Sequence, residues 1–441
     1  MSKSISPLGP ILRTSLPGPQ SAAVIAADQR LISPSYTRGY PLVAKRGEGM
    51  YIVDADDNRF LDFTAGIAVC STGHCHPDVV AAIQRQAGEL IHMSGTDFYY
   101  DLMPRVSELI SATAPMPGPH RFFFSNSGAE AMECALKLAR YHTRRPYFIG
   151  FYHCFHGRTF GALSMTSSKQ SQRAHFAPLL PGFFHISYPN PYRPPHGASD
   201  PVAACLEELD RLFHTTTPAS EVAAVVLEPV QGEGGYIVPP KAFVQELRRV
   251  CDREGILLIA DEVQSGAGRT GKMWAIEHFG VAPDIVCSAK GIASGMPLGV
   301  TFSRAGIMDW ASGAHASTFG GNPVCLASAE ATIKLLTGSL IRNAAEVGAH
   351  MMERLKSWPQ RHACIGEVRG LGLMIGLEIV RDRGARTPDP ARRDRIVDTA
   401  FERGLLILGC GSTSLRLMPP LIVTREQADV ALDLLELALN A

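Results

Sequence analysis

Three ionisable residues stand at the carboxyl ends of three short apolar runs of the kind expected for buried strands. The runs are AAVVLEPV (223–230), GILLIADEV (255–263) and PDIVCSAK (283–290), and the ionisable residues are Glu228, Asp261 and Lys290. Lysine is almost never fully buried unless it is paired, so Lys290 either extends to solvent or takes part in chemistry. Because ligands of open α/β sheets bind just outside the carboxyl ends of the strands, we expect the three side chains to line one crevice.

The elements that must position these residues follow a repeating order. From about residue 78 to 335, strand-like apolar runs alternate with helical patterns such as KAFVQELRRVCDREG, which lies between the first two strands. That alternation is typical of a parallel sheet with crossover helices, and continuous apolar runs suit strands buried on both faces. We therefore expect an α/β fold with a mainly parallel central sheet, helices on both faces, and a large domain at 78–335.

A fourth pattern, RFFFSNSGAEAMECALKLAR (121–140), predicts a strand followed by a helix. Ser127 and Glu130 have the S-x-x-E spacing of a capping box. Small residues at a helix N-terminus also let a phosphate approach the free N–H groups there. The residues alone leave both interpretations open.

The two ends of the chain have a different organisation. Residues 1–77 contain a short helical pattern, SAAVIAADQRL, and two strand patterns around the turn Asp56-Asp57-Asn58. Residues 336–441 predict a smaller α/β domain of roughly a hundred residues, in which a helix precedes one strand, RGLGLMIGLEIV, a charged loop, RDRGARTPDPARRDR, a helix and a last strand. We expect the N-terminal segment to join this smaller domain.

Composition narrows the functional class. The 441 residues are 46% hydrophobic and 19% charged, with 42 basic and 42 acidic side chains and no basic stripe. This argues against nucleic acid or an anionic membrane as the main partner. Proline and glycine interrupt the apolar runs at the start of the chain, and no apolar window approaches roughly 18 residues, so we expect neither a signal peptide nor a membrane helix. The ten scattered cysteines suggest reduced thiols in a cytoplasmic protein.

Two other patterns are rejected as sites. His74, Cys75 and His76 are adjacent, so their side chains point in different directions, and no second cluster completes a metal site. GAGRTGK (266–272) almost matches a phosphate-binding loop, but Met273 replaces the hydroxyl residue that would hold Mg²⁺.

A set of six motifs carries a family resemblance. They are FSNSGAEAMECALKLAR, FHGRTFGALSMT, EPVQGEGG, LLIADEVQSGAGRTG, SAKGIASGMPLG and STFGGNP. In this order, and covering nearly the whole chain, they resemble class III pyridoxal-5′-phosphate aminotransferases, nearest to 4-aminobutyrate aminotransferases. YPNPYRPP and LLILGCG with LRLMPPLI resemble a branch that also includes amino-acid racemases. The resemblance implies the fold-type I architecture of pyridoxal-phosphate-dependent transferases.

The resemblance also implies roles for the residues of the crevice. Lys290 is expected to bind the cofactor aldehyde and then to move a proton as a base, which requires a lowered pKa. Asp261 is expected to pair with the pyridine nitrogen of the cofactor. The other residues implied in cofactor binding are Ser127, Gly128, Ala129, Phe155, His156, Glu228, Val263, Gln264 and, from a neighbouring subunit, Thr318.

Four residues are implied in substrate binding. Arg158 and Arg416 are the expected carboxylate anchors, since arginine binds carboxylates in a bidentate manner. Glu233 resembles the switch residue of the family, which neutralises Arg416 while a 4-aminobutyrate-like donor is bound and leaves when 2-oxoglutarate needs that arginine. Ile67 matches the apolar residue of the 4-aminobutyrate type, where ornithine aminotransferases have tyrosine.

The resulting hypothesis is transamination from an ω-amino acid, with 4-aminobutyrate favoured, to 2-oxoglutarate. We expect a homodimer with shared active sites, and in one alternative two such dimers pair into a tetramer. An amino-acid racemase or epimerase of the same family is the main rival, and an acetylornithine- or ornithine-type aminotransferase is another. A non-catalytic cofactor-binding regulator needs a fused DNA-binding segment, and no basic helix-turn-helix pattern is present.

Overall fold

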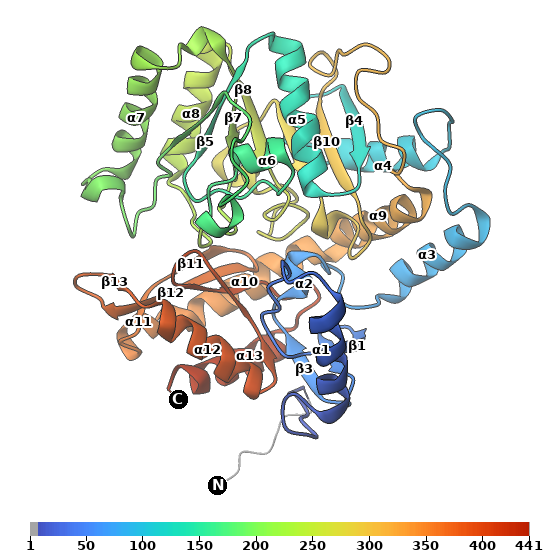
Figure 1. The fold of residues 1–441 in the computed structure, drawn as a ribbon, viewed down its shortest axis with the longest axis vertical. Helices are drawn as coiled ribbons and strands as arrows, with labels where there is room; N and C mark the ends of the chain where they lie inside the picture. The colour runs from blue at the N-terminus through green and yellow to red at the C-terminus, as the bar shows by residue number, and fades with distance from the viewer. Residues whose placement is uncertain (1–7, 441) are drawn as a thin grey trace.

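A seven-stranded sheet forms the centre of the upper part of the molecule in Figure 1, which shows the computed structural model. The structure describes residues 8–440. Residues 1–7, part of the stretch for which the sequence predicts no signal peptide, lie outside the described residues. The strand order is β4-β10-β9-β8-β7-β5-β6, and the bounds are β4 His120–Ser125, β5 Tyr147–Phe151, β6 Phe183–Ile186, β7 Val222–Leu227, β8 Leu257–Asp261, β9 Ile285–Ser288 and β10 Gly299–Arg304.

The prediction of a mainly parallel sheet is confirmed. Strands β9, β8, β7, β5 and β6 pair in parallel, and β10 runs antiparallel between β9 and β4. Every residue of β7, β8 and β9 is buried, as expected for strands covered on both faces.

Helices cover both faces of this sheet. On one face, α5 (Gly128–Thr143) and α6 (Phe160–Met165) pack on the strands through an apolar cluster that includes Met132, Phe148 and Ile259. On the other face lie helices that share a second, larger cluster: α4 (Leu102–Ser111), α7 (Pro201–Thr215), α8 (Lys241–Glu254) and α9 (Pro323–Leu335).

The two ends of the chain lie side by side below this sheet, blue and red in Figure 1. One small sheet has the order β1-β2-β3-β14, in which β14 (Leu405–Leu406) from the C-terminal part pairs in parallel with β3 (Arg59–Asp62). The other has the order β11-β12-β16-β15, with β13 beside β12. The remaining bounds are α1 Pro19–Leu31, β1 Ala44–Glu48, β2 Tyr51–Asp54, α2 Ala65–Ala68, α3 Pro77–Glu89, α10 Ile341–Leu355, α11 Trp358–Arg361, β11 Ile365–Leu371, β12 Met374–Asp382, β13 Thr387–Pro388, α12 Pro390–Glu402, β15 Leu408–Cys410, β16 Ser414–Leu417 and α13 Arg425–Leu439.

Two expectations for the C-terminal part are wrong. RGLGLMIGLEIV is not one strand but the two arms of a hairpin, in which Leu371 pairs with Met374 and Gly372 adopts φ +53°. Glycine adopts this left-handed conformation without steric penalty, which is what the turn requires. The charged loop is also shorter than expected, because α12 begins at Pro390 with Asp389 as its N-cap, whose side chain accepts from the Arg392 N–H.

A continuous helical run at 323–361 is long and apolar enough, by length and composition, to cross a membrane. Length and composition alone do not distinguish a membrane span from a helix in the core of a protein, so the expectation of no membrane helix stays a prediction. In the structure 56% of its apolar window is buried, and Leu326, Ala329 and Leu336 are among its fully buried side chains. Burial in the protein core accounts for the apolar character of this run.

Candidate active site

The carboxyl edge of the large sheet holds a cavity of about 450 Å³. Glu228 follows β7 directly, Asp261 is the last residue of β8, and Lys290 lies just beyond β9. The three strands thus deliver their ionisable residues to one cavity, as the sequence predicts. The other lining residues are Val69, Asn126, Ser127, Gly128, Ala129, Phe155, His156, Gly157, Arg158, Val263, Gln264, Ala289, Gly295, Met296, Pro297 and Leu298.

Lys290 is held in an uncommon backbone conformation. Its φ is +48°, in the left-handed region that non-glycine residues rarely adopt. Among the described residues its ammonium group has no hydrogen bond or ion pair. Burial lowers the pKa of Lys290 below its ordinary value, and Glu233 partly opposes this by raising it. A partly buried amine with a lowered pKa is a stronger candidate for nucleophile and base than an exposed lysine.

The Asp261 carboxylate is fixed by two hydrogen bonds. Its Oδ1 accepts from the Val263 N–H at 3.0 Å, and its Oδ2 lies 2.6 Å from Nδ1 of the buried His156. Burial lowers the pKa of His156, but Cys154 and Asp261 together oppose burial, and the pKa lies well above its ordinary value. The two contacts keep the Asp261 carboxylate in a fixed orientation.

Glu228 lies beside this pair and is 6% exposed. Its carboxyl oxygens accept from the N–H groups of Phe155 and Gly232, each at 3.2 Å. Burial, with the negative charge of Asp261, raises the pKa of Glu228 to about 8 although His156 lowers it. Glu228 is therefore largely protonated at neutral pH, and its contacts join the loops that follow β5 and β7.

The N-terminus of α5 forms one wall of the cavity. The Ser127 hydroxyl accepts from the Glu130 N–H at 3.2 Å, as a helix cap does. The predicted reciprocal bond differs, because Glu130 accepts from the Asn126 N–H at 2.8 Å. The first N–H groups of a helix have no intrahelical acceptor, so those of Gly128 and Ala129 remain available to an anion at this positive helix end.

The residues of this cavity fit a flat, phosphate-bearing cofactor. A Cβ atom on Gly128 would lie 2.7 Å from Val263 Cγ1, so only glycine lets α5 come this close to the apolar residue after β8. The buried Gln264 Oε1 has no hydrogen-bond partner among the described residues, which leaves a polar atom for the cofactor. Phe155 lines the same cavity. An anion site, an apolar slot and a fixed carboxylate thus lie together.

The expected substrate residues are brought together only in part. Arg416 is 4% exposed, and its Nη1 lies 2.5 Å from Glu233 Oε1. Burial raises the pKa of Glu233, but Arg416 and Lys169 outweigh it and the pKa lies below its ordinary value. Arg158 is exposed, lines the cavity and has no polar partner within residues 8–440.

Two further expected residues lie outside the cavity lining. Ile67 is 44% exposed and belongs to a short left-handed turn with Ala65 and Ala68, which also have positive φ. Thr318 is exposed on the loop before α9. In the single chain neither residue reaches the cofactor cavity.

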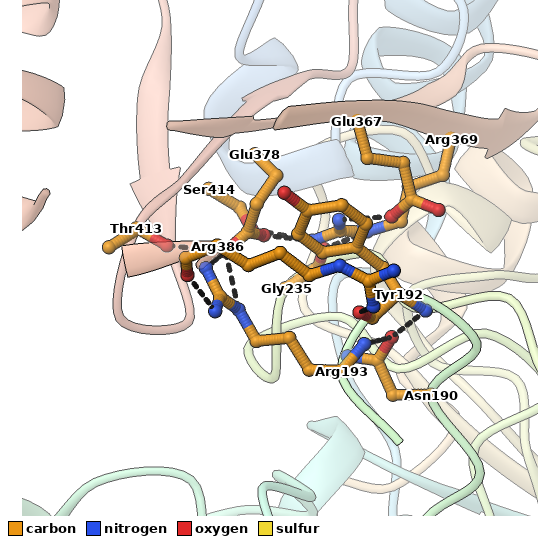
Figure 2. A network of polar contacts seen from close by, with 10 residues as sticks. All are labelled: Asn190, Tyr192, Arg193, Gly235, Glu367, Arg369, Glu378, Arg386, Thr413 and Ser414. Carbon is orange, nitrogen blue, oxygen red and sulfur yellow. Dashed lines mark hydrogen bonds and ion pairs between the residues drawn. The ribbon is translucent and has the colours of Figure 1, made fainter. Parts of the chain in front are cut away.

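A polar network behind the Glu233–Arg416 pair escaped the sequence analysis. Figure 2 shows the buried Arg369 of β11 donating to the Gly235 carbonyl, to Glu378 at 2.7 Å and to the Ser414 hydroxyl at 2.6 Å. Arg193 also binds Glu378, at 3.0 Å. The only sequence signal is that Arg369 opens the apolar, glycine-rich run RGLGLMIGLEIV, which the sequence predicts to be a single strand.

Lys169 is the second residue that was missed. Its Nζ lies 3.4 Å from Glu233 Oε2, on the side of the carboxylate that Arg416 does not occupy. The residue lies on the loop after α6, 64 positions from its partner, and no motif of the sequence marks it.

Comparison with known proteins identifies the family. The aminotransferase class-III family profile matches residues 32–439. Similar relatives are an alanine/serine racemase of Pyrococcus horikoshii (41% identity, 96% of this chain and 91% of that protein), an acetylornithine aminotransferase of Methanosarcina mazei (41%, 94% and 96%) and a 4-aminobutyrate aminotransferase of Escherichia coli (38%, 90% and 93%). The solved structure of an amine transaminase from an uncultivated Pseudomonas species, in its PLP-bound form, superposes with a TM-score of 0.86 at 37% identity over 93% of this chain and 97% of that one.

The chain belongs to the class III aminotransferases and is a pyridoxal-phosphate-dependent enzyme of fold type I. The bound cofactor supplies an electron sink for the pair of electrons released when a proton leaves the substrate carbon.

The residues of the cavity have separate tasks towards this cofactor. Asp261, held by His156, would keep the pyridine nitrogen protonated, and the α5 N-terminus would hold the phosphate. Lys290 would accept and return the proton at the substrate carbon. It is the only lysine among the described residues that line the cavity, and burial lowers the pKa of its amine.

Proposed function

We propose that this enzyme transfers the amino group of an ω-amino acid, with 4-aminobutyrate favoured, to 2-oxoglutarate. The Glu233–Arg416 pair carries the proposal. While the arginine is neutralised, a donor with one carboxylate binds through Arg158 and places its amino group at Lys290. An acceptor with two carboxylates requires Arg416 as well, and Glu233 must then leave it.

The relatives support the class of reaction and leave the donor open. A 4-aminobutyrate aminotransferase and an acetylornithine aminotransferase are both similar over most of their length. Ile67 favours 4-aminobutyrate, since its apolar side chain offers no hydrogen bond to the second amino group of an ornithine-type donor.

The experiment is a half-reaction without keto acid. Holoenzyme is mixed with 4-aminobutyrate, and the absorbance of the bound cofactor is followed until it reaches the pyridoxamine form. We expect bleaching that 2-oxoglutarate reverses. Bleaching with N-acetylornithine in its place would make the acetylornithine reaction the function, and no bleaching with any ω-amino acid would overturn the proposal.

A racemase is the second candidate, because one relative at 41% identity is an alanine/serine racemase. Racemisation needs an acid opposite Lys290 that donates a proton to the other face of the substrate carbon. If Glu233 served as this acid it would need a proton, yet its ion pair with Arg416 keeps its pKa below the ordinary value despite burial. We therefore expect single enantiomers of alanine and serine to keep their configuration when incubated with holoenzyme, as followed by chiral chromatography.

We also propose a homodimer with shared active sites. The segment 90–99 packs against the loop of Thr318, where the Asn322 amide donates to the Ile91 carbonyl at 2.9 Å and the Phe319 ring contacts that of His92 at a tilt of 36°. Large apolar side chains are exposed on these two segments, namely Leu90, Ile91, Met93, Phe98, Tyr99 and Phe319. An apolar patch of this kind is typical of an interface, and a second copy seated on it would receive Thr318 at its phosphate site. Pairing of dimers into tetramers and the cytoplasmic location stay predictions.

A further inference from the structure

The Glu233 carboxylate has two cationic neighbours, one for each oxygen. Arg416 binds Oε1 at 2.5 Å, and Lys169 lies 3.4 Å from Oε2. The arginine side chain is 5% exposed and the lysine side chain 43% exposed. One partner of the acid is therefore buried beside the active site, while the other stands at the solvent-facing edge.

The backbone on both sides of the Glu233–Arg416 pair is held in place. The Glu233 carbonyl accepts from the Gly411 N–H at 2.7 Å. Arg369 donates to the Gly235 carbonyl from Nε at 3.0 Å, and to the hydroxyl of Ser414, two residues before Arg416 (Figure 2). Because this network fixes both chain segments, separation of the pair must come from rotation of the Glu233 side chain.

There is room for that rotation on the side of Lys169. A second cavity of about 510 Å³ lies behind the loop of Glu233, and its lining includes Lys169, Gly234 and Ser412. The backbone of Lys169 is itself held, since its carbonyl accepts from the Gln172 N–H at 3.1 Å. A carboxylate that leaves Arg416 thus moves toward a cation whose position is already set.

The energetics require such a second partner. A substrate carboxylate that takes Arg416 leaves Glu233 as an unpaired, mostly buried charge, and a charge in that state is strongly destabilising. We propose that Lys169 is the residue that receives Glu233 when a dicarboxylate occupies Arg416, and that it thereby sets the affinity for dicarboxylate substrates. This inference rests on the proposed roles of Arg416 and Glu233 as carboxylate anchor and switch.

The test compares how holoenzyme binds glutarate, a dicarboxylate, and butyrate, a monocarboxylate, through the absorbance of the bound cofactor. In Lys169→Met we expect the dissociation constant of glutarate to rise roughly three- to fivefold, the upper end of the range for an ion pair with one exposed partner. Butyrate affinity should change less than twofold. Lys169→Arg should restore glutarate binding, and Lys241→Met, at an exposed lysine that begins α8, should alter neither ligand.

A double-mutant cycle separates this role from direct attraction of the ligand. In a Glu233→Gln background no carboxylate has to be received, so Lys169→Met should no longer weaken glutarate binding. If the loss persisted there, Lys169 would contact the ligand itself and the inference would be wrong. Unchanged glutarate binding in Lys169→Met alone, or an equal loss of glutarate and butyrate, would also overturn it.

Steady-state kinetics give a second readout. The KM for 2-oxoglutarate should rise in Lys169→Met while the KM for the amino donor and kcat stay within twofold. Because ligand binding needs no turnover, the two proposals fail separately. Absence of bleaching with ω-amino acids overturns the proposed function, and a glutarate affinity independent of Lys169 overturns this inference.

Discussion

At the scale of the residue, the conformation of Lys290 bears on its chemistry. Its positive φ places the side chain through backbone geometry, without a polar partner among the residues that the structure describes. The next residue is closely packed, since a Cβ atom on Gly291 would lie 2.4 Å from the Ser71 hydroxyl. The ammonium group is therefore positioned and left free to react.

Lys290→Ala should abolish transamination, because no other lysine lines the cavity. The variant should still bind pyridoxal phosphate noncovalently through the α5 N-terminus and Asp261. Absorbance after gel filtration measures cofactor retention, and the half-reaction measures activity. Full activity of the variant would remove Lys290 from the mechanism.

Glu228 makes stability depend on pH. Its pKa is raised from 4.5 to about 8, so its stabilising contribution is complete below pH 4.5 and is lost as the pH rises through 8. Glu228→Gln keeps the neutral form at every pH. We expect its Tm to fall less between pH 6 and pH 9 than that of the wild type, by roughly 2 °C or more.

Thermal unfolding at the two pH values measures this difference. Glu207→Gln, at an exposed glutamate of α7, is the matched control and should behave as the wild type. Equal losses of Tm in Glu228→Gln and the wild type would show that Glu228 does not carry the proton.

At the scale of the element, the approach of α5 to the end of β8 defines the cofactor slot. Gly128→Ala would place a Cβ atom 2.7 Å from Val263 Cγ1, and overpacking of this kind typically destabilises by about 1–3 kcal/mol. The dissociation constant of pyridoxal phosphate should rise about tenfold or more, as measured by equilibrium titration. Gly88→Ala in α3, where nothing lies within 4 Å, should leave it unchanged.

The elements that could be predicted from sequence are those whose neighbours are close in the chain. Strands β7, β8 and β9 and helix α8 followed from continuous apolar runs and periodicity, and with them the placement of Glu228, Asp261 and Lys290. The β11–β12 hairpin was misinterpreted because Gly372 and Leu373 carry no polar turn signal. The terminal helix α13 was missed although its Thr424–Gln427 capping box is plain in the structure.

The ion pairs around Glu233 could not be predicted in full. Arg416 was accessible because an arginine in an apolar strand is unusual, and the family resemblance supplied its partner. Lys169 and Arg369 depend on which loops the fold brings together, 64 and 134 residues apart for Lys169–Glu233 and Arg369–Gly235. No local pattern specifies such pairings.

At the scale of the whole molecule, the exposed apolar patch of segment 90–99 and Phe319 predicts association. Tyr99 is fully exposed in the single chain, so Tyr99→Glu would bring a charge into the proposed interface. We expect dissociation to monomers at micromolar concentration in light scattering, together with weaker binding of pyridoxal phosphate. Leu437→Glu, at an exposed leucine of α13, is the control and should remain a dimer. A Tyr99→Glu variant with wild-type mass would contradict the proposed interface.

The pairing of β3 with β14 has a consequence for biosynthesis on the ribosome. The Tyr40 hydroxyl donates to the Ile407 carbonyl, 367 residues away. The N–H group of Leu61 in β3 donates to the Gly404 carbonyl, and that of Phe63, just after β3, donates to the Leu406 carbonyl. At about 5–20 residues per second, the nascent N-terminal strands wait roughly 20–70 s for the partner that completes their sheet. During that interval they expose an open edge, so this segment is where we expect chaperones to engage the growing chain and where premature termination should leave an aggregating product.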